Sequence, residues 1–460
     1  MTGRVTWTWG VLCMALLANV ALAAQPQNKA TAEDSVPKTA AVKPEASVTM
    51  SNGSWLDPST LATRDTLTNN WFGIGKQLED SGITVSLGLT QIYQINMRGG
   101  AFTHKHAGRY TGSWDLELEI DPGTLLKSDF LKNGKFYMAA EGSWSDGLNG
   151  TTPASVGSLF GVNADAAGDR SIDVTQYWYQ HNFLDDKVRV RIGKVDIDGG
   201  FKCHGCDVAF DTNAFASDET SQFLNGALTG NPTIPAPDNG LGVILYVEPI
   251  EGMYLAAAIT DGEADSRETG FATTFGGPDY FFSIYEMGFV PQFDSAKGKL
   301  PGTYRVGLWY HPYPITKYDG SGTQRDTIGV YTSCDQVVWK ENADKDDMQG
   351  LGAFFRYGLS DADVEAGEIK AFYSAGVQYQ GVIPGRDDDV VGLGFAYGAI
   401  SKQSGHTANN ESVIEGYYNI QITPWMTVTP SLQVIFNPGG ENTGGVHDAV
   451  VAGIRMQWAF

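Results

Sequence analysis

The chain has 460 residues, with 53 acidic and 31 basic side chains and only four cysteines. A net charge of −22 argues against a nucleic-acid-binding protein, which needs a positive face for the phosphates. Four cysteines are too few for a disulfide-built scaffold. The 56 glycines exceed the usual ~7%, and the charged fraction of 18% lies below the usual ~25%. Such a glycine-rich, charge-poor chain, hydrophilic on average, is typical of a transmembrane β-barrel.

The first residues predict export from the cytoplasm. Arg4 is the only charged residue among the first 24, and an apolar stretch from Val11 to Leu17 leads to Ala21-Leu22-Ala23-Ala24. This order is that of a secretory signal peptide, which we place at residues 1–23. The alternative is a membrane anchor, but Asn19 interrupts a run that is already short for crossing lipid.

Two further segments precede the main pattern. Residues 24–54 are rich in Ala, Pro, Thr, Lys and Ser without periodicity, so we expect a flexible linker. Residues 55–82 are expected to form an N-terminal periplasmic segment, with a short amphipathic helix over 71–80 before the turn at Ser81-Gly82.

From Ile83 onward, apolar and polar residues alternate with the period of two that is typical of β-strands. A water-soluble sandwich also alternates, with its apolar faces turned inward. The pattern recurs over 83–460, which is long for one sandwich. The last residue, Phe460, falls on the apolar face of the last strand, as in the insertion signal of outer-membrane proteins. Strand ends carry the aromatic residues of a membrane-interface girdle: Trp114, Trp144, Trp178, Trp309, Tyr310, Trp425 and Trp458.

The predicted fold class is therefore all-β, a transmembrane outer-membrane antiparallel β-barrel over residues 83–460. About sixteen strands are expected, enough for an aqueous channel. The stretches 145–170, 197–239 and 261–279 are expected to be extracellular loops. The predicted strands are 83–97, 111–121, 134–144, 171–181, 188–196, 240–248, 252–261, 280–290, 302–312, 328–340, 349–359, 366–381, 389–401, 411–422, 426–437 and 449–460.

Five short motifs carry a family resemblance. They are Trp71–Leu78 with Gly82-Ile83-Thr84, Arg189–Lys194 before an aspartate-rich turn and Phe201, Phe223-Leu224-Asn225, Pro384–Asp389 before Gly392–Phe395, and Pro430–Gly440. Together they resemble the OprB family of carbohydrate-selective porins, and the similarity runs from Trp71 to Phe460. The resemblance implies a sixteen-stranded outer-membrane barrel that admits sugars by facilitated diffusion. Cys203-His204-Gly205-Cys206 and the acidic segment around 335–347 depart from the family pattern.

A sugar channel needs hydrogen-bonding side chains on its inner wall, where width, donors, acceptors and the local field set selectivity. An arginine opposite a carboxylate would offer planar donors to neighbouring hydroxyls. For each candidate, a salt bridge within the wall or a solvated charge remains the alternative. Arg386 is expected instead to brace a turn through its aspartate neighbours. The inward-phase candidates are Asp115, Glu117, Glu119, Arg189, Arg191, Glu415, Gln421, Gln433, Arg455 and Gln457.

Cys203 and Cys206 form the CxxC sequence of the chain. A zinc site would need two more ligands, and no second CxxC exists. In an oxidising compartment we favour a disulfide between Cys203 and Cys206 that tightens a loop, which leaves Cys334 unpaired. Gly392-Leu393-Gly394-Phe395 resembles half a dinucleotide loop but lies in a strand pattern, so we interpret its glycines as small lumen-facing positions.

We expect a passive porin of the bacterial outer membrane, with small sugars as permeants and outer-membrane lipid around it. The main alternative is a general or cation-preferring diffusion porin, since acidic residues that line the lumen would favour cations. A barrel hydrolase or a soluble sugar-binding protein is a weaker alternative. We expect no cofactor, no metal site and no enzymatic activity, because no recognisable nucleophile constellation is present. The preferred sugar stays open, as does the choice between a homotrimer and a monomer.

Overall fold

The computed structural model describes residues 60–460, apart from short gaps at 151–152, 198–200, 204–205, 209, 212, 217–222, 279, 345–348, 362–363, 365–367 and 442–444. The predicted signal peptide and linker, residues 1–54, and the start of the N-terminal segment lie outside the described residues.

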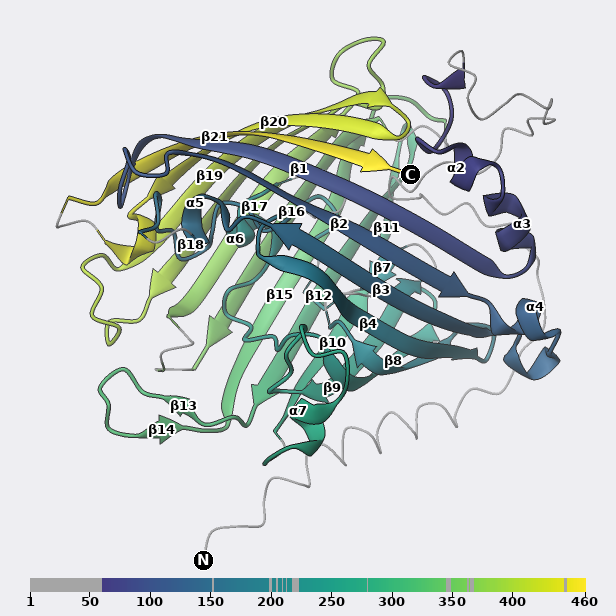
Figure 1. Ribbon diagram of the computed structural model, residues 1–460, viewed down its shortest axis with the longest axis horizontal. Helices are drawn as coiled ribbons and strands as arrows, with labels where there is room; N and C mark the ends of the chain where they lie inside the picture. Colours follow the sequence, from purple (N-terminus) through teal and green to yellow (C-terminus); the bar gives the residue numbers. More distant parts are fainter. Residues whose placement is uncertain are drawn as a thin grey trace, which may run out of the picture.

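Sixteen antiparallel strands of the described chain close into one barrel, because the last strand pairs with the first (Figure 1). Each coincides with one predicted strand to within four residues at either end, so the predicted barrel is confirmed. The strands are β1 (Ile83–Gly100), β2 (Gly108–Ile120), β3 (Gly134–Trp144), β4 (Arg170–Phe183), β5 (Val188–Val195), β8 (Gly240–Ile250), β9 (Met253–Asp261), β10 (Phe281–Phe289), β12 (Gly298–His311), β15 (Thr327–Lys340), β16 (Gly350–Ser360), β17 (Ile369–Gln380), β18 (Val390–Ile400), β19 (Asn410–Thr423), β20 (Met426–Phe436) and β21 (His447–Ala459).

The remaining elements are short and lie before or between these strands. The helix expected over 71–80 is confirmed only in its second half, because Gly73 takes a left-handed conformation and separates two short helices. The short elements are α2 (Asn69–Phe72), α3 (Gly75–Asp80), α4 (Pro122–Leu126), η2 (Asp129–Leu131), α5 (Gly147–Gly150), β6 (Phe201–Cys203), β7 (Cys206–Val208), α6 (Gly226–Thr229), α7 (Ala272–Phe275), β11 (Gln292–Ser295), β13 (Ile315–Thr316), β14 (Thr323–Gln324) and η3 (Pro438–Gly440).

The two ends of the barrel differ in the length of their connections. At one end, the turn end, connections are as short as Glu251-Gly252, where Gly252 has the positive φ of 76° that a tight hairpin favours. Residues 60–82, before β1, also lie at this end, where the indole N–H of Trp425 donates to the carbonyl of Leu61 over 2.7 Å. At the other end, the loop end, the long connections 145–169 and 196–239 leave the strands.

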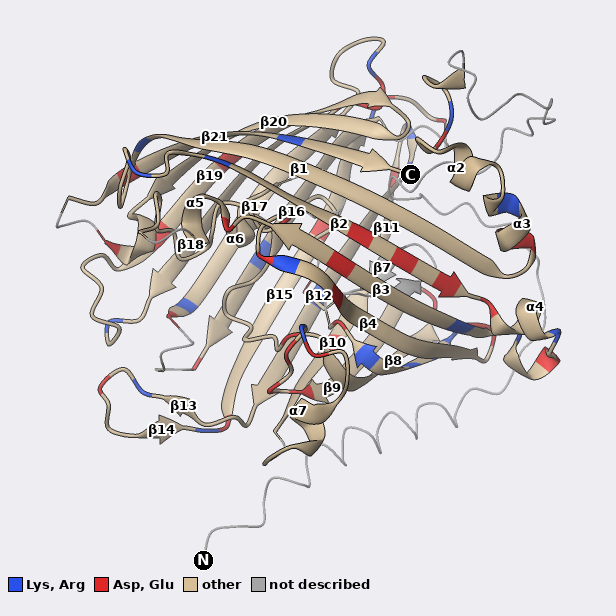
Figure 2. Ribbon diagram, viewed as in Figure 1, with Lys and Arg blue, Asp and Glu red and all other residues tan. Residues whose placement is uncertain are grey.

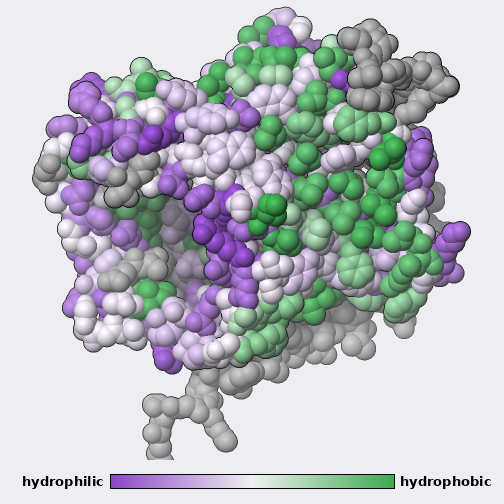
Figure 3. Space-filling model, viewed as in Figure 1, coloured by the Kyte–Doolittle hydropathy of each residue, from purple (hydrophilic) through white to green (hydrophobic). Residues whose placement is uncertain are grey.

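Alternation sorts the strand residues between an apolar outer face and a mixed inner face. On β5, Ile192 is 51% exposed while its neighbour Arg191 is buried. On β21, Ile454 points outward and Arg455 is fully buried. Hydrophobic residues accordingly gather over the outside of the strands in Figure 3. This outer face suits hydrocarbon, in which a closed barrel leaves no strand edge unpaired. No helix among the described residues is long and apolar enough to cross a membrane.

The described parts of the connections 145–169 and 196–239 are loops, as expected, and fold into the barrel rather than away from it. We call them the first and second inner loops. Both are rich enough in apolar side chains to form a core with the inner wall, and burial of those side chains stabilises the inward position. The loops contribute Leu148, Val156, Val162, Phe223, Ala227 and Leu228, and the wall contributes Phe354, Phe372, Val413, Tyr417, Ile435 and Val451.

Glycines on the inner wall leave space into which the second inner loop packs. A Cβ atom at Gly394 on β18 would lie 2.8 Å from the side chain of Leu228 and 2.9 Å from that of Phe223. A Cβ atom at Gly358 on β16 would lie 2.2 Å from Oγ1 of Thr233. The interpretation of Gly392 and Gly394 as small lumen-facing positions is therefore confirmed: the second inner loop occupies the space at Gly394, and the ring of Tyr417 on β19 occupies the space at Gly392.

Gly394→Ala is expected to destabilise the protein by about 1–3 kcal/mol, because the added methyl group overpacks the contact with Leu228 and Phe223. Gly416→Ala on β19 is the matched control, since its Cβ atom would meet no atom closer than 3.7 Å. Urea unfolding of both variants in lipid vesicles measures the difference. Equal free energies of unfolding would show that the loop does not pack tightly at Gly394.

Candidate functional site

One sector of the inner wall stays open to water. We call it the open wall and define it by seven inward side chains of β1, β2 and β3: Thr84, Ser86, Asp115, Glu117, Glu119, Lys135 and Glu141. Of these, Thr84, Ser86 and Glu117 are exposed to solvent and the other four are partly exposed. The residues that alternate with them on β2, Leu116 and Leu118, point outward. The open wall is therefore the polar surface that a solute in the lumen meets.

Carboxylates dominate the open wall and follow one another along β2 (Figure 2). Asp115 lies directly across from Glu141 of β3, an arrangement of like charges that costs stability in a sheet. The ammonium group of Lys135 offsets part of the charge, because it lies 2.9 Å from both carboxylate oxygens of Glu119. Glu141 accepts a hydrogen bond of 2.8 Å from the hydroxyl of Thr175. The open wall therefore carries four acids and one lysine.

The open wall continues into a cavity of about 430 Å³ at the turn end. Glu119 and Lys135 line this cavity together with Gln180 and Asn182 of β4, and Glu79 of α3 borders it. Carboxylate, ammonium and amide groups thus surround one space, which supplies both acceptors and donors for hydrogen bonds.

Arg189 and Arg191 point inward, as expected, but lie flat against the wall. The guanidinium of Arg191 stacks on the ring of Trp178 at 3.9 Å and donates to Oε1 of Gln180 over 3.2 Å. Arg189 lies over the ring of Tyr246 at 5.4 Å and donates to the carbonyl of Asp186 over 3.2 Å. Both side chains are buried, so their donors serve the wall itself in this conformation.

Glu415, Gln433 and Arg455 also point inward, but the inner loops cover them completely. Glu415 accepts hydrogen bonds from the backbone N–H groups of residues 224 and 225, at 3.0 and 2.9 Å. Gln433 donates to the carbonyl of Val162 over 2.9 Å, and Arg455 lies 2.7 Å from a carboxylate oxygen of Asp165. The expectation that these three line the open channel is corrected, because each binds a loop instead.

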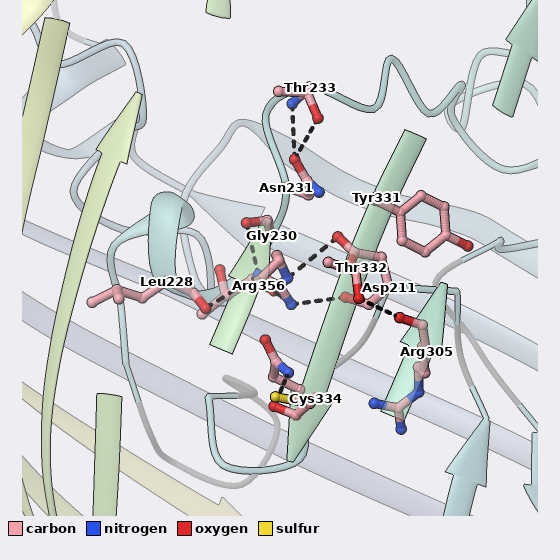
Figure 4. Close-up of polar contacts among 12 residues, drawn as sticks. Asp211, Leu228, Gly230, Asn231, Thr233, Arg305, Tyr331, Thr332, Cys334 and Arg356 are labelled. Carbon is pink, nitrogen blue, oxygen red and sulfur yellow. Dashed lines mark hydrogen bonds and ion pairs between the residues drawn. The ribbon is translucent and has the colours of Figure 1, made fainter. Parts of the chain in front are cut away.

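A second anchor of the inner loops was missed by sequence reasoning. Arg356 of β16 donates to carbonyls of the second inner loop and lies 3.3 Å from a carboxylate oxygen of Asp211 (Figure 4). Nearby, Arg305 of β12 lies 3.0 Å from Asp335, and Glu286 accepts the backbone N–H of Asp211 over 2.8 Å. The inward phase of β16 would have placed Arg356 in the lumen, but its partners are more than 120 residues away in sequence.

The first inner loop has its own anchor on β19. Glu411 accepts hydrogen bonds from the hydroxyl of Ser158 and, over 2.9 Å, from the backbone N–H of Leu159. The same carboxylate accepts the N–H of Gly439 over 2.7 Å. Glu411 and Glu415 therefore act alike, each with one loop.

The turn after β17 contains the predicted brace. Arg386 donates to both carboxylate oxygens of Asp389, over 2.8 and 2.6 Å, and to the carbonyl of Gln421 over 3.0 Å. The hydroxyl of Tyr418 donates to the same carboxylate over 2.6 Å. The predicted role of Arg386 in a turn is confirmed, and Gln421 of β19 holds this turn through its backbone N–H and carbonyl groups rather than lining the open wall.

The two cysteines of the CxxC sequence lie on the short paired strands β6 and β7 of the second inner loop. Cys203 of β6 pairs with Cys206 of β7 through the backbone, while their side chains lie outside what the structure describes. The disulfide therefore stays a prediction. Cys334 is free. Among the described residues, no group of three or more His, Cys, Asp or Glu side chains is arranged to hold a metal ion.

Three comparisons bear on the family. The family model for carbohydrate-selective porins of the OprB family matches residues 105–460. Porin B of Pseudomonas aeruginosa is 24% identical over 434 residues, which cover 85% of this chain and 90% of that protein. Porin AaxA of Chlamydia muridarum is 24% identical over 266 residues, 57% of this chain and 51% of that protein. The high-pH structure of Pseudomonas putida OprB has a TM-score of 0.68 at 19% identity, covering 87% of this chain and all of that one, so it shares the fold.

The inward position of the second inner loop, which we call its seated position, is expected to become less stable as the pH rises from about 4 to 7. Burial raises the pKa of Asp211 to about 7, although Arg356 acts in the opposite direction. An aspartate released to water has a pKa of ~3.9, so the seated loop binds the proton more tightly than the released loop does. Acid therefore favours the seated loop, and this contribution is lost as the pH passes through the raised pKa.

Amide hydrogen exchange at Leu228 and Gly230, corrected for the intrinsic rate at each pH, measures this effect. Protection should fall between pH 4 and 7 in the native protein and change less in Asp211→Asn. The same fall in both proteins would exclude Asp211 as its origin.

Proposed function

Since this chain belongs to the OprB family of carbohydrate-selective porins, we propose that it passes monosaccharides and small oligosaccharides by passive diffusion along the open wall. The protein is a carbohydrate-selective porin of the outer membrane, and its family and fold are those of a channel rather than an enzyme. The observation that carries the proposed path is the water-exposed row of Asp115, Glu117 and Glu119 on β2, beside Lys135 of β3.

The chemistry of the open wall suits polyhydroxylated solutes. A sugar hydroxyl donates to a carboxylate such as that of Glu117 and accepts from an ammonium such as that of Lys135. A sugar that moves along β2 exchanges water for these partners one at a time, so no large desolvation step arises. Conduction needs binding that is favourable enough for entry and weak enough for release, and partly hydrated carboxylates meet both conditions.

We also propose the direction of the channel and its surroundings. The short connections and the N-terminal segment of the turn end would lie in the periplasm, and the loop end would face the outside. The apolar outer face, with side chains such as Ile192 and Leu393 more than half exposed, would contact outer-membrane lipid. One chain encloses a complete lumen, so a single copy suffices for conduction in either a monomer or a homotrimer.

The charge of the open wall favours a second candidate function, a cation-preferring diffusion porin. The four carboxylates face Lys135 and, at Glu141, Arg170 over 3.8 Å, so the local field stays negative and would attract cations and repel anions in a narrow pore. The carboxylates have a different role in each of the two functions. For the sugar porin they are hydrogen-bond acceptors that bind a neutral solute, and for the cation porin they act only through charge.

Glucose or maltose at millimolar concentration is expected to reduce the ion current of single channels in planar bilayers and to swell protein-containing liposomes. In the double variant Glu117→Gln/Glu119→Gln, the concentration for half-block should rise roughly five- to tenfold, because hydrogen bonds to charged groups are worth more than about 1 kcal/mol. Glu251→Gln, at the exposed turn between β8 and β9, is the matched control and should leave the block unchanged.

The reversal potential in a salt gradient separates the two candidate functions. If sugars neither permeate nor block while the wild-type channel strongly prefers cations, the carbohydrate path proposed here fails and the cation porin is supported. If the double variant loses cation preference but keeps its sugar block, the sugar path does not run along the open wall.

A further inference from the structure

We propose that Arg356 and Glu415 are positioning residues that clamp the segment 224–230 of the second inner loop by its two ends, and so set the size limit of the channel. Both lie on the inner wall, Arg356 on β16 and Glu415 on β19, with exposed fractions of 1% and 0%. The inference depends on the chain being a channel, but not on its preference for sugars.

Glu415 holds the beginning of this segment. Its two carboxylate oxygens accept the backbone N–H groups of Leu224 and Asn225, at 3.0 and 2.9 Å. The side chain of Asn225 then donates to Gln433 over 3.0 Å and to the carbonyl of Gly161 over 2.8 Å. Through Asn225, the same anchor reaches the first inner loop, so both loops depend on this position.

Arg356 holds the end of the segment. One guanidinium nitrogen donates to the carbonyls of Leu228 and Gly230, at 3.4 and 2.8 Å, and the other to those of Thr229 and Asp211, at 3.4 and 2.9 Å (Figure 4). The planar guanidinium thus gathers several carbonyl groups that point in different directions, which a single ammonium does less well.

The sign of each charge matches the backbone that it binds. A carboxylate meets N–H groups at the start of α6, and a guanidinium meets C=O groups at its end, so each charge interacts favourably with the local peptide dipoles. Between the two anchors, Leu228 fills the space above Gly394. Removing either charge leaves buried backbone groups without partners, which favours release of the segment from the wall.

Release of the segment would widen the channel. In its seated position the segment covers the wall of β16–β20, which leaves the sector beside β1–β3 for the passage of solutes. Arg356→Met and Glu415→Gln should therefore raise single-channel conductance and increase the permeation of maltotriose relative to glucose at least fivefold. Arg356→Lys, which keeps the charge, should give an intermediate effect. Because both residues hold one segment, the double variant should resemble the single variants rather than add their effects.

The size limit is measured with neutral polyethylene glycols of graded mass, which do not report sugar binding. A failed sugar assay with a shifted size limit would count against the proposed permeant and in favour of the clamp. Heat-modifiable mobility on gels identifies folded barrels, and the conservative variants Arg356→Lys and Glu415→Gln provide the test if Arg356→Met does not fold. An unchanged size limit in folded variants, or additive effects in the double variant, would overturn the clamp.

A disulfide tether tests whether the effect passes through the position of the loop. Gly358→Cys and Thr233→Cys are added to Arg356→Met in a chain whose native cysteines are serine, because a Cβ atom at Gly358 would lie close to the Thr233 side chain. The oxidised protein should regain the native size limit, and a reductant should remove it again. If the oxidised and the reduced protein have the same size limit, the clamp is contradicted, because holding the loop in place would then not restore the native selectivity.

Discussion

Backbone N–H and C=O groups need partners wherever water is scarce, and this requirement acts twice in the protein. In the wall it is met by the sixteen-stranded sheet, in which β21 pairs with β1 and leaves no free edge. Inside the lumen, irregular loop backbone faces the same requirement without a neighbouring strand. There the partners are side chains of the wall, as with Glu415 for residues 224 and 225 and Glu411 for residue 159. The buried charges of the inner wall follow from the loops folding inward.

The charged residues of the lumen therefore fall into two groups with different surroundings. The anchors are buried and matched with opposite charges or with peptide groups, as in the pairs Arg455–Asp165 and Arg305–Asp335. The open wall is partly exposed and unbalanced, because its four carboxylates face Lys135 and, at Glu141, Arg170 over 3.8 Å. Water screens the partly exposed charges of the open wall, whereas the anchors are buried and bind groups of the protein itself. Part of the chain's net charge of −22 thus lies on the open wall.

The sequence predicts the barrel well because lipid and lumen impose opposite demands on neighbouring residues. Ile454 and Arg455 illustrate this, since a shift of one residue would place the arginine in lipid. The alternation also identified Glu415 and Gln433 as inward-facing. It could not show that loops cover them, because a period of two assigns a residue to a face and says nothing about what lies against that face. The partner of Glu415 is about 190 residues away in sequence. The glycines at 392 and 394 indicated that other side chains pack closely against this part of the inner wall.

Apolar packing and charge contribute differently to the seating of the second inner loop. Phe223 and Leu228 supply buried area, but hydrophobic contacts are non-directional and would tolerate a loop displaced along the wall. The two anchors are directional, because a shifted segment would leave a buried carboxylate or guanidinium without its partners. Packing thus favours an inward loop, and the charges favour one position of that loop. A channel with a defined width needs the second property, which explains why full-length charged side chains occupy sites where apolar residues would bury as much surface.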